Sequence, residues 1–353
     1  MPFINGIGLI SPQLTAEPGG FLTEITEYTA DFLKCIQPPS FKTYIDPIQS
    51  RRMSRLIKMG VAAAKISIAE SACSMPDAII TGTGLGSVED TERILGDITR
   101  DEKFLNPTPF IQSTYNTISS QIAIQLKCHH YNSTYVHRTF SFESALLDGM
   151  MLLEEMTTGN VLIGGIDEMT QNHLLITRRT GQWKKSPVNN LNIFKEKSSG
   201  ALPGEGAAFF VLGAENREST YAFLKDVKTC INLDGSLQTD QELAVFLEKN
   251  NLSAVDIDIV ILGHNGDCNQ DEVYTRLAET RFAGKSQARY KHLCGEYHTA
   301  TGFALYVAAG ILKHQFYPDI LQMNQVLPRK LKNILIYNHY RNVNHTFILV
   351  QSA

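Results

Sequence analysis

The 353-residue sequence has no long apolar run, no excess of basic residues and no cysteine pairs at metal-binding spacing. No stretch approaches the roughly 20 apolar residues that a membrane helix needs. The N-terminal MPFINGIGLISPQ also lacks the basic region of a signal peptide. With a net charge of −4 and no Lys/Arg cluster, the chain offers little attraction for nucleic acid. These absences predict a cytoplasmic globular protein that binds neither membranes nor nucleic acids.

The cysteines and acidic residues do not form a recognisable metal site. The run from Asp267 to Asp271 imitates the opening of a calcium loop, but Glu272 replaces the required glycine and Ala278 replaces the bidentate glutamate. The six cysteines lack CxxC or zinc spacing, which predicts reduced and mostly buried thiols. They are Cys35, Cys73, Cys128, Cys230, Cys268 and Cys294.

A glycine-rich turn in TGTGLGS raises the question of a dinucleotide cofactor. Gly82 and Gly84 have the right spacing, but Gly86 is misplaced for GxGxxG and no suitably placed acid ends a following strand. A tight backbone turn after a strand explains the glycines better. The sequence therefore predicts no metal and no cofactor.

Short apolar strands alternate with amphipathic helices throughout, which predicts an α/β protein with buried sheets. The length favours two domains or one duplicated unit. The polar GAENREST after Leu212 divides the chain into candidate halves, residues 1–213 and 214–353. Strands are expected at 3–9, 78–81, 133–137, 161–164, 207–212, 259–262, 333–337 and 346–350. Helices are expected at 54–73, 144–156, 241–249 and 301–314.

Two short segments of the C-terminal half carry candidate functional side chains. His264 directly follows the strand IVIL, and α/β sites gather at the carboxyl ends of strands. The alternative is a hydrogen-bonded loop histidine. Lys291 and Glu296 in KHLCGEYHTATG, taken alone, predict a solvated charge pair.

Several motifs together resemble a known family. GTGLGSVEDTE, NPTPFIQSTYNTISSQIAIQL, VLIGGIDE, ALPGEGAAFFVL, ILGHNGDCNQD and KHLCGEYHTATGFA occur in the order expected of a β-ketoacyl synthase of the thiolase fold. The resemblance spans nearly the whole chain. It implies a duplicated five-layer αβαβα architecture and a dimer that receives acyl chains from an acyl carrier protein.

The family's nucleophile is missing from this sequence. The resemblance implies a cysteine at a helix N-terminus, where the dipole favours the thiolate. The corresponding stretch, TYVHRTFSFESALLDG, has none, and no cysteine lies between Cys128 and Cys230. Alignment from the strand side places Phe140 at that position, and alignment back from the GGID pair places Phe142 there. Ser141 and Ser144 are substitute nucleophiles in principle, although a serine at a helix start is usually an N-cap.

The family's second motif also departs from the pattern. The resemblance matches His264 to the first family histidine and Lys291 to the family lysine, but Glu296 replaces the second histidine. His298 is a stand-in if the loop is rearranged. The glycine-rich oxyanion loop of the family corresponds to HYRNVN, which includes Tyr340 and lacks those glycines.

These losses predict a ketosynthase-like subunit without condensing activity, similar to a chain-length factor. Its partner would be an active ketosynthase, in polyketide, aryl polyene or fatty-acid-type assembly, or a second copy of itself. The strand 133–137 is expected to pair across the dimer, and 110–114, with Phe110 and Ile111, to reach the partner's pocket. The alternatives are an acyltransferase or hydrolase that uses His264 with Ser141, Ser144 or His298, and a module that binds acyl chains or carrier proteins.

Overall fold

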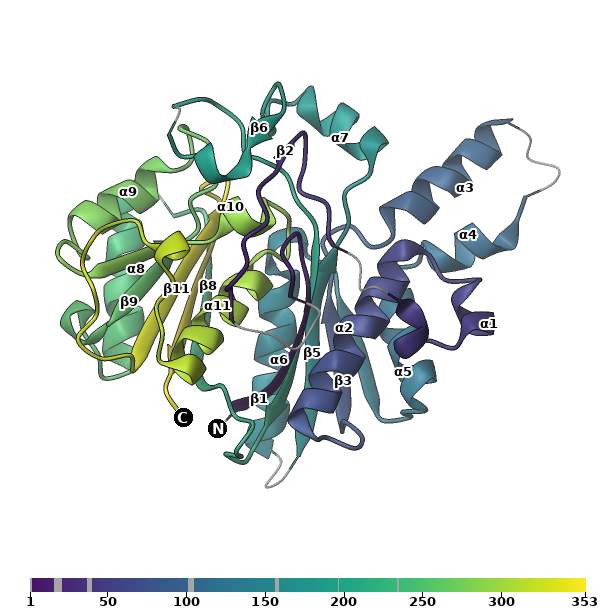
Figure 1. Ribbon diagram of the computed structural model, residues 1–353, viewed down its shortest axis with the longest axis horizontal. Helices are drawn as coiled ribbons and strands as arrows, with labels where there is room; N and C mark the ends of the chain where they lie inside the picture. Colours follow the sequence, from purple (N-terminus) through teal and green to yellow (C-terminus); the bar gives the residue numbers. More distant parts are fainter. Residues whose placement is uncertain are drawn as a thin grey trace.

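A single sheet runs through the centre of the protein (Figure 1). The computed structural model describes residues 2–15, 21–36, 40–100, 105–155, 159–195, 197–233 and 235–353. Within them the sheet has ten strands in the order β10-β9-β11-β12-β8-β1-β7-β5-β3-β4. The strands from the first part of the chain are β1 (Phe3–Ile10), β3 (Ala78–Gly82), β4 (Tyr131–Tyr135), β5 (Asn160–Asp167) and β7 (Gly206–Gly213). Those from the second part are β8 (Ala222–Ile231), β9 (Ile259–Leu262), β10 (Ser286–Arg289), β11 (Asn333–Tyr340) and β12 (Asn344–Gln351).

The two sets of five strands have the same topology. From the edge inward, β4-β3-β5-β7-β1 corresponds to β10-β9-β11-β12-β8. In both sets the three outer strands are parallel and the two inner pairings are antiparallel. In the sheet, the two sets meet where β1 pairs with β8, with Phe3 opposite Phe223 and Ile4 opposite Ala222. This repetition fits a duplication, and the division after Gly213 stays a prediction.

Helices cover the sheet in layers, because alternate residues of each strand face opposite sides. The helices α2 (Arg55–Ser71) and α5 (Thr117–Leu126) pack on the outer face of the first set. The helices α8 (Gly235–Lys249) and α9 (Glu272–Glu279) pack on the outer face of the second. Between the sets lie α6 (Ser141–Glu155) and α11 (Thr301–His314), in one core that includes residues of both. The predicted five-layer α/β architecture is confirmed.

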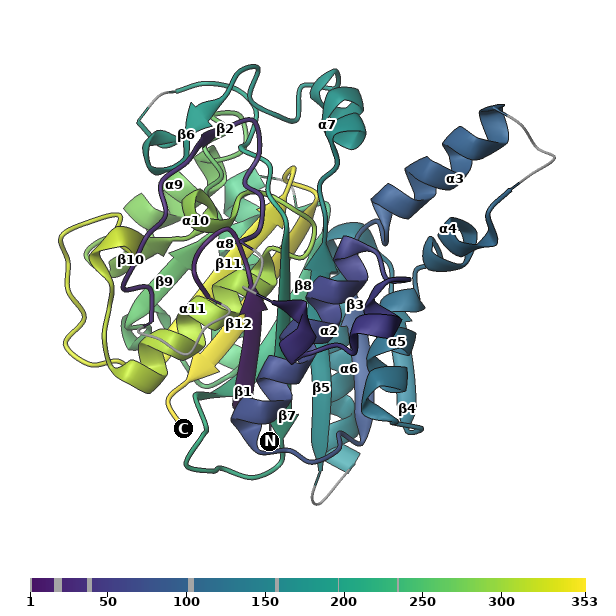
Figure 2. The same ribbon diagram turned by 45° about the vertical axis from the view of Figure 1, so that its right-hand side comes forward.

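Two helices extend away from this body on the side of the first strand set. They are α3 (Val88–Arg100) and α4 (Pro107–Gln112), and both views show them projecting from the remainder of the fold (Figures 1 and 2). Smaller elements cap the ends of the strands: α1 (Pro47–Ser50), α7 (Gln171–Arg178), α10 (Lys291–Cys294) and the two-stranded pair β2 (Thr29–Ala30) and β6 (Val188–Asn189).

The predicted elements agree with the structure where apolar residues dominate. The predictions for β9 and α11 have the observed bounds, and those of β1 and α2 differ by one or two residues at the ends. The edge strand β4 begins and ends two residues earlier than predicted. The prediction missed β8 and β10, whose sequences AFLKDVKTCI and SQAR include charged side chains and lack a clear alternation.

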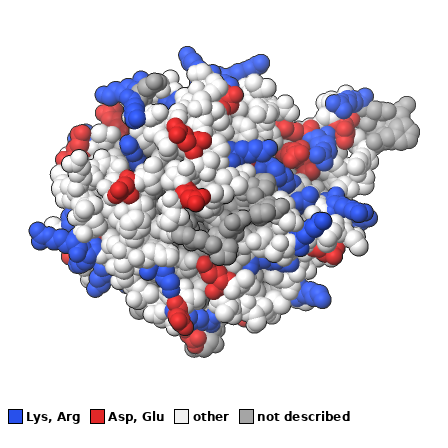
Figure 3. All heavy atoms as spheres, viewed as in Figure 1, with Lys and Arg blue, Asp and Glu red and all other residues white. Residues whose placement is uncertain are grey.

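The surface charges and the cysteine thiols show no concentrated feature. On the face drawn in Figure 3, acidic and basic side chains are interspersed and form no extended patch of one sign. In the part of the chain that the structure describes, no helix has the length and apolar content to cross a membrane. All six cysteines are free thiols, and four of them are buried as predicted.

Candidate functional site

The corner between β4 and α6 is formed by one 3-10 turn, Arg138–Phe140. Arg138 has a φ of 48°, in the left-handed region that non-glycine side chains rarely adopt. Its side chain is exposed. Nucleophiles of α/β enzymes can occupy such a strained turn between strand and helix, so Arg138 is a further candidate for the nucleophile position. Sequence reasoning missed it because no glycine marks the turn. The assignment to Phe140 or Phe142 stays a prediction.

The two phenylalanines have different surroundings. Phe140 stacks on the imidazole of His137, with ring centroids 5.4 Å apart and planes 13° apart. Phe142 is fully buried and lies 5.8 Å from the ring of Phe210. A Cβ on Gly165 would stand 2.8 Å from the Phe142 ring. Phe142 therefore fills the core between β5 and the helices.

The serines at this corner are poorly placed to act as nucleophiles. Ser141 is fully buried; its hydroxyl accepts a hydrogen bond from the amide of His137 (2.8 Å) and donates one to the carbonyl of Thr83 (2.9 Å). Ser144 is only partly buried. Among the described residues, no histidine imidazole is hydrogen-bonded to either hydroxyl. Neither serine has the adjacent base that would activate it.

A buried carboxylate joins three of the sequence motifs. Asp167, at the end of β5, accepts hydrogen bonds from the amides of Gly84 (2.8 Å) and Thr299 (2.9 Å) and from the Thr299 hydroxyl (2.9 Å). Burial raises the pKa of Asp167 to about 6. A Cβ on Gly84 would stand 2.4 Å from the His298 side chain, so only glycine fits there. The glycine-rich turn thus serves close packing.

The segments ILGHNGD and KHLCGEYHTATG form a compact polar cluster in the interior of the molecule. The Lys291 ammonium lies 2.6 Å from a Glu296 carboxylate oxygen, and the Asn265 amide donates to the same oxygen at 2.8 Å. The lysine and glutamate side chains are 0% and 5% exposed. The prediction of a solvated pair, made from these two residues alone, is therefore wrong, because both motifs end in the interior beneath the PGEGA segment. We call Asn265, Lys291, Glu296 and Tyr340 the inner site.

His264 and Asn265 face opposite sides of the loop that follows β9. Asn265 points into the inner site, whereas His264 lines a separate cavity and has only a 3.4 Å contact from Nε2 to the hydroxyl of Thr275. Successive residues of an extended segment point in opposite directions, which separates the two. The structure therefore does not bring His264 together with Glu296. Sequence reasoning missed Asn265, for which the only signal was its place beside the histidine.

Little space remains at the inner site. The cavity lined by Asn265, Glu296, Tyr340 and Arg341 measures about 10 Å³, and a neighbouring cavity beside His298 measures about 30 Å³. The turn in HYRNVN places Arg341 and Asn342 at φ 56° and 53° between β11 and β12, and Tyr340 lies with its ring 5.3 Å from that of His298. One water needs about 10–15 Å³. An acyl chain does not fit in this conformation.

The histidines near this cluster are held neutral. Burial lowers the pKa of His298 to about 4, and burial with the charges of Arg289 and Lys291 lowers the pKa of His264 to about 3. Glu143, in the first turn of α6, is fully buried, and burial raises its pKa to about 7. Its Oε1 accepts a hydrogen bond from the Thr346 hydroxyl at 3.3 Å.

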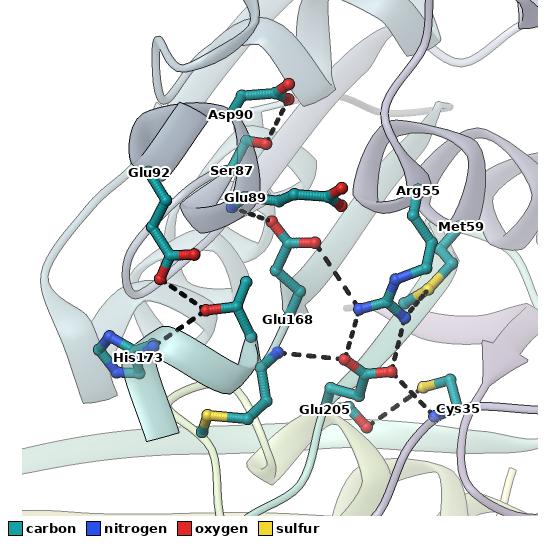
Figure 4. Close-up of polar contacts among 12 residues, drawn as sticks. Cys35, Arg55, Met59, Ser87, Glu89, Asp90, Glu92, Glu168, His173 and Glu205 are labelled. Atoms are coloured by element: carbon teal, nitrogen blue, oxygen red, sulfur yellow. Dashed lines mark hydrogen bonds and ion pairs between the residues drawn. The ribbon is translucent and has the colours of Figure 1, made fainter. Parts of the chain in front are cut away.

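A second buried ion pair anchors the PGEGA segment (Figure 4). The guanidinium of Arg55 binds both oxygens of Glu205 at 2.6 Å, and Glu168 lies 3.7 Å from the same guanidinium. The Glu205 carboxylate also accepts the amides of Cys35 and Met169. Burial raises the pKa of Glu168 to about 7. These contacts fix α2 beside the start of β7, although the Glu168 Oε2 has only the 3.7 Å contact with Arg55 and no hydrogen bond.

The remaining predicted pocket residues lie outside the inner site. Phe110 and Ile111 are on α4, with 63% and 62% of their surfaces exposed. Ile111 also lines a groove of about 520 Å³ between α4, α5 and the α1 region. Their contact with a partner's pocket stays a prediction.

Comparison with known proteins gives a family match over part of the chain. Residues 34–175 match the family described as Beta-ketoacyl synthase, N-terminal domain. No curated protein sequence matches the chain at a significant level. The resemblance seen in the motifs is thus confirmed over that range.

Solved structures match over the full length. The ishigamide ketosynthase/chain length factor superposes with a TM-score of 0.81 at 16% identity, covering 100% of this chain and 99% of the other. A β-ketoacyl synthase from Burkholderia phymatum STM815 gives 0.79 at 14% identity, covering 100% and 99%. The ketosynthase ApeO in complex with its chain length factor ApeC, from Xenorhabdus doucetiae, gives 0.76 at 14% identity, covering 100% and 98%. These likenesses establish the thiolase-like ketosynthase fold.

Proposed function

Because the chain has the fold of the β-ketoacyl synthases, we propose that it is a ketosynthase-like subunit that does not itself condense acyl chains. Its inner site carries the proposal: Glu296 occupies the place of a family histidine and neutralises Lys291 in a cavity of about 10 Å³. Condensation needs a thiolate, donors aimed at the developing oxyanion, and room for the substrate. This chain has no cysteine between Cys128 and Cys230.

The partner in this proposal is an active ketosynthase, which would carry out the decarboxylative condensation on acyl carrier protein substrates. Two features support an interface. The strand β4 is the edge of the sheet, with Tyr131 48% exposed, and Val136 just beyond it is 41% exposed. An uncovered edge strand offers unpaired backbone groups to another chain. The exposed Phe110 and Ile111 of α4 add apolar surface of the kind that partners cover.

Intact-mass spectrometry tests the loss of acyl-enzyme chemistry. The purified chain is incubated with acyl and malonyl thioesters on carrier protein, and we expect no added acyl group. A stoichiometric adduct on Ser141 or Ser144 would instead support the acyltransferase or hydrolase alternative. Ser141→Ala and Ser144→Ala variants locate such an adduct.

Site-specific photo-crosslinking in the native host tests the partnership. A photoreactive residue at Val136 should capture a ketosynthase, whereas the same residue at Val245, 56% exposed on α8, should not. Capture of a second copy of this chain alone at Val136 would indicate a homodimer. Binding of carrier protein without any ketosynthase would favour the binding-module alternative.

A charge at Val136 provides the matched solution test. Val136→Asp should weaken association with the partner at least about tenfold, because a carboxylate would be buried without a counter-charge. Val245→Asp is the control and should leave association unchanged. Circular dichroism establishes that both variants are folded.

A further inference from the structure

A cavity of about 430 Å³ lies on the other side of the β9 loop from the inner site. Its walls include Ile193, Phe194 and Met323, with His264 and Arg289 at the carboxyl ends of β9 and β10. The volume falls in the range of roughly 300–1,000 Å³ that is usual for small-molecule sites. In α/β proteins, ligands usually bind beyond the carboxyl ends of neighbouring parallel strands. We call this cavity the outer pocket.

Arg289 is arranged as a preformed cationic wall of the outer pocket. Its guanidinium carbon lies 3.9 Å from the centroid of the Phe194 ring, a cation–π contact that fixes the guanidinium plane. Among the described residues, this guanidinium has no hydrogen-bond or ion-pair partner. It is only partly exposed, and five N–H donors are unused. Such a group favours a planar anion that accepts two hydrogen bonds.

Two acidic residues also line the pocket, and the charge of Asp271 partly offsets that of Arg289. The Asp271 carboxylate is already engaged by the amides of Asn265 and Gly266, both at 2.9 Å. Glu272, in the first turn of α9, and Lys197 also line the pocket, and both side chains are exposed. The free donors inside are therefore cationic, and the acidic groups are either engaged or solvated.

His264 supplies the second polar element. It is 5% exposed, lines the pocket, and its Nδ1 has no hydrogen-bond partner among the described residues. A buried polar atom without a partner is uncommon in native proteins. The other ring nitrogen, Nε2, has only the 3.4 Å contact with the hydroxyl of Thr275, which also lines the pocket.

We propose that the outer pocket binds a small organic anion, a carboxylate or phosphate monoester with a short apolar body. Arg289 binds the anionic head, His264 contributes a hydrogen bond, and Ile193, Phe194 and Met323 pack on the apolar part. This site does not involve the nucleophile position or the dimer edge, so it holds whether or not the chain partners a ketosynthase.

Cys268 gives a built-in reporter of occupancy, because it is exposed and lines the same pocket. The full chain is labelled with a thiol-reactive bimane, and peptide mapping follows Cys268 separately from the half-buried Cys230. Hexanoate and butyl phosphate are the anionic probes, inorganic phosphate tests the head group alone, and hexanamide is the neutral match. Calorimetry measures the dissociation constants.

We expect an anion at ten times its Kd to slow Cys268 labelling about tenfold, and hexanamide to have no effect. Arg289→Gln should raise the Kd of the anion at least about tenfold, and Arg289→Lys less. Arg329→Gln, an exposed arginine outside the pocket, is the matched control and should bind as the wild type does. Thermal unfolding establishes that each variant is folded.

Three results would overturn the proposal. Hexanoate and hexanamide could protect Cys268 equally, no anion could protect it at tens of millimolar, or Arg289→Gln could bind as tightly as the wild type. A preference for butyl phosphate over hexanoate would assign the phosphate source, and the reverse would assign the carboxylate source.

Discussion

The inner site and the outer pocket lie on opposite faces of the same loop after β9 and differ in how their polar groups are satisfied. At the inner site, Lys291 and Asn265 are both bonded to Glu296, beside a cavity of about 10 Å³. In the outer pocket, about 430 Å³ is open, and Arg289 and the Nδ1 of His264 lack hydrogen-bond partners among the described residues. A polar cluster that satisfies itself serves structure, whereas unused donors beside open space point to a ligand.

The largest expected effect comes from breaking the inner ion pair. Glu296→Leu leaves the ammonium of Lys291 buried without a counter-charge, which should lower the free energy of unfolding by about 3–5 kcal/mol. Urea denaturation at neutral pH measures it. The matched control is Glu272→Leu at the rim of the outer pocket, where an exposed acid should cost at most about 0.5 kcal/mol.

Equal losses in these two variants would mean that the buried pair contributes no more than a surface charge. The contrast between a self-satisfied inner site and an open outer pocket would then fail.

The free energy of unfolding should depend on pH because the carboxyl group of Glu143 is buried. The pKa of Glu143 is raised in the folded state from 4.5 to about 7. The protonated Glu143 side chain therefore contributes fully to stability below its unfolded pKa of 4.5, and this contribution is lost as the pH rises through about 7. Glu143→Gln should remove this loss, which is on the order of 2–3 kcal/mol between pH 4.5 and 8.

Denaturant titrations from pH 5 to pH 8 check this prediction. Glu272→Gln, at an exposed acid, should leave the wild-type slope unchanged. A steeper fall in stability for Glu143→Gln than for the wild type would contradict the sign.

A double substitution tests whether Lys291 and Glu296 stabilise the fold by interacting directly. Lys291→Met combined with Glu296→Leu replaces both charges with apolar groups, which is often nearly neutral for buried pairs. We expect the double variant to recover most of the loss of Glu296→Leu, ending within about 2 kcal/mol of the wild type. A double-mutant cycle in urea measures the coupling, and strictly additive losses would argue against a direct interaction.

The smallest effect on stability is expected in the outer pocket. Among the described residues, the Arg289 guanidinium makes no hydrogen bond, so Arg289→Gln removes only its contact with Phe194. It should change the free energy of unfolding by less than about 1 kcal/mol. The same change should strongly weaken anion binding. A large loss of stability would instead indicate that Arg289 belongs to the structural framework.

Much of the fold could be predicted, because apolar periodicity and motif order survive in the sequence. The bounds of β9 and α11 follow from runs of apolar residues, and the layered α/β class follows from the alternation of elements. The strand β8, which joins the two halves, could not be predicted, because Lys225, Asp226 and Lys228 interrupt its apolar pattern. Its place is set by pairing with β12 along nearly its whole length.

The candidate site was predictable in its composition and less so in its geometry. The absence of a cysteine between Cys128 and Cys230 can be read from the sequence alone, and the family resemblance predicts that Glu296 stands in place of a histidine and HYRNVN in place of a glycine-rich loop. The strained turn at Arg138 could not be, because a left-handed φ at an arginine leaves no compositional signal.

By itself the sequence determined which chemical groups this protein has and in what order they occur, since the motifs and their missing members are properties of the chain. Only the tertiary structure decided which of them meet. His264 and Asn265 are neighbours in sequence, yet one faces an open pocket and the other a closed cluster. The physical reason is that a shift of one residue in an extended segment exchanges its two faces, and the packing of β9 between β10 and β11 sets that register.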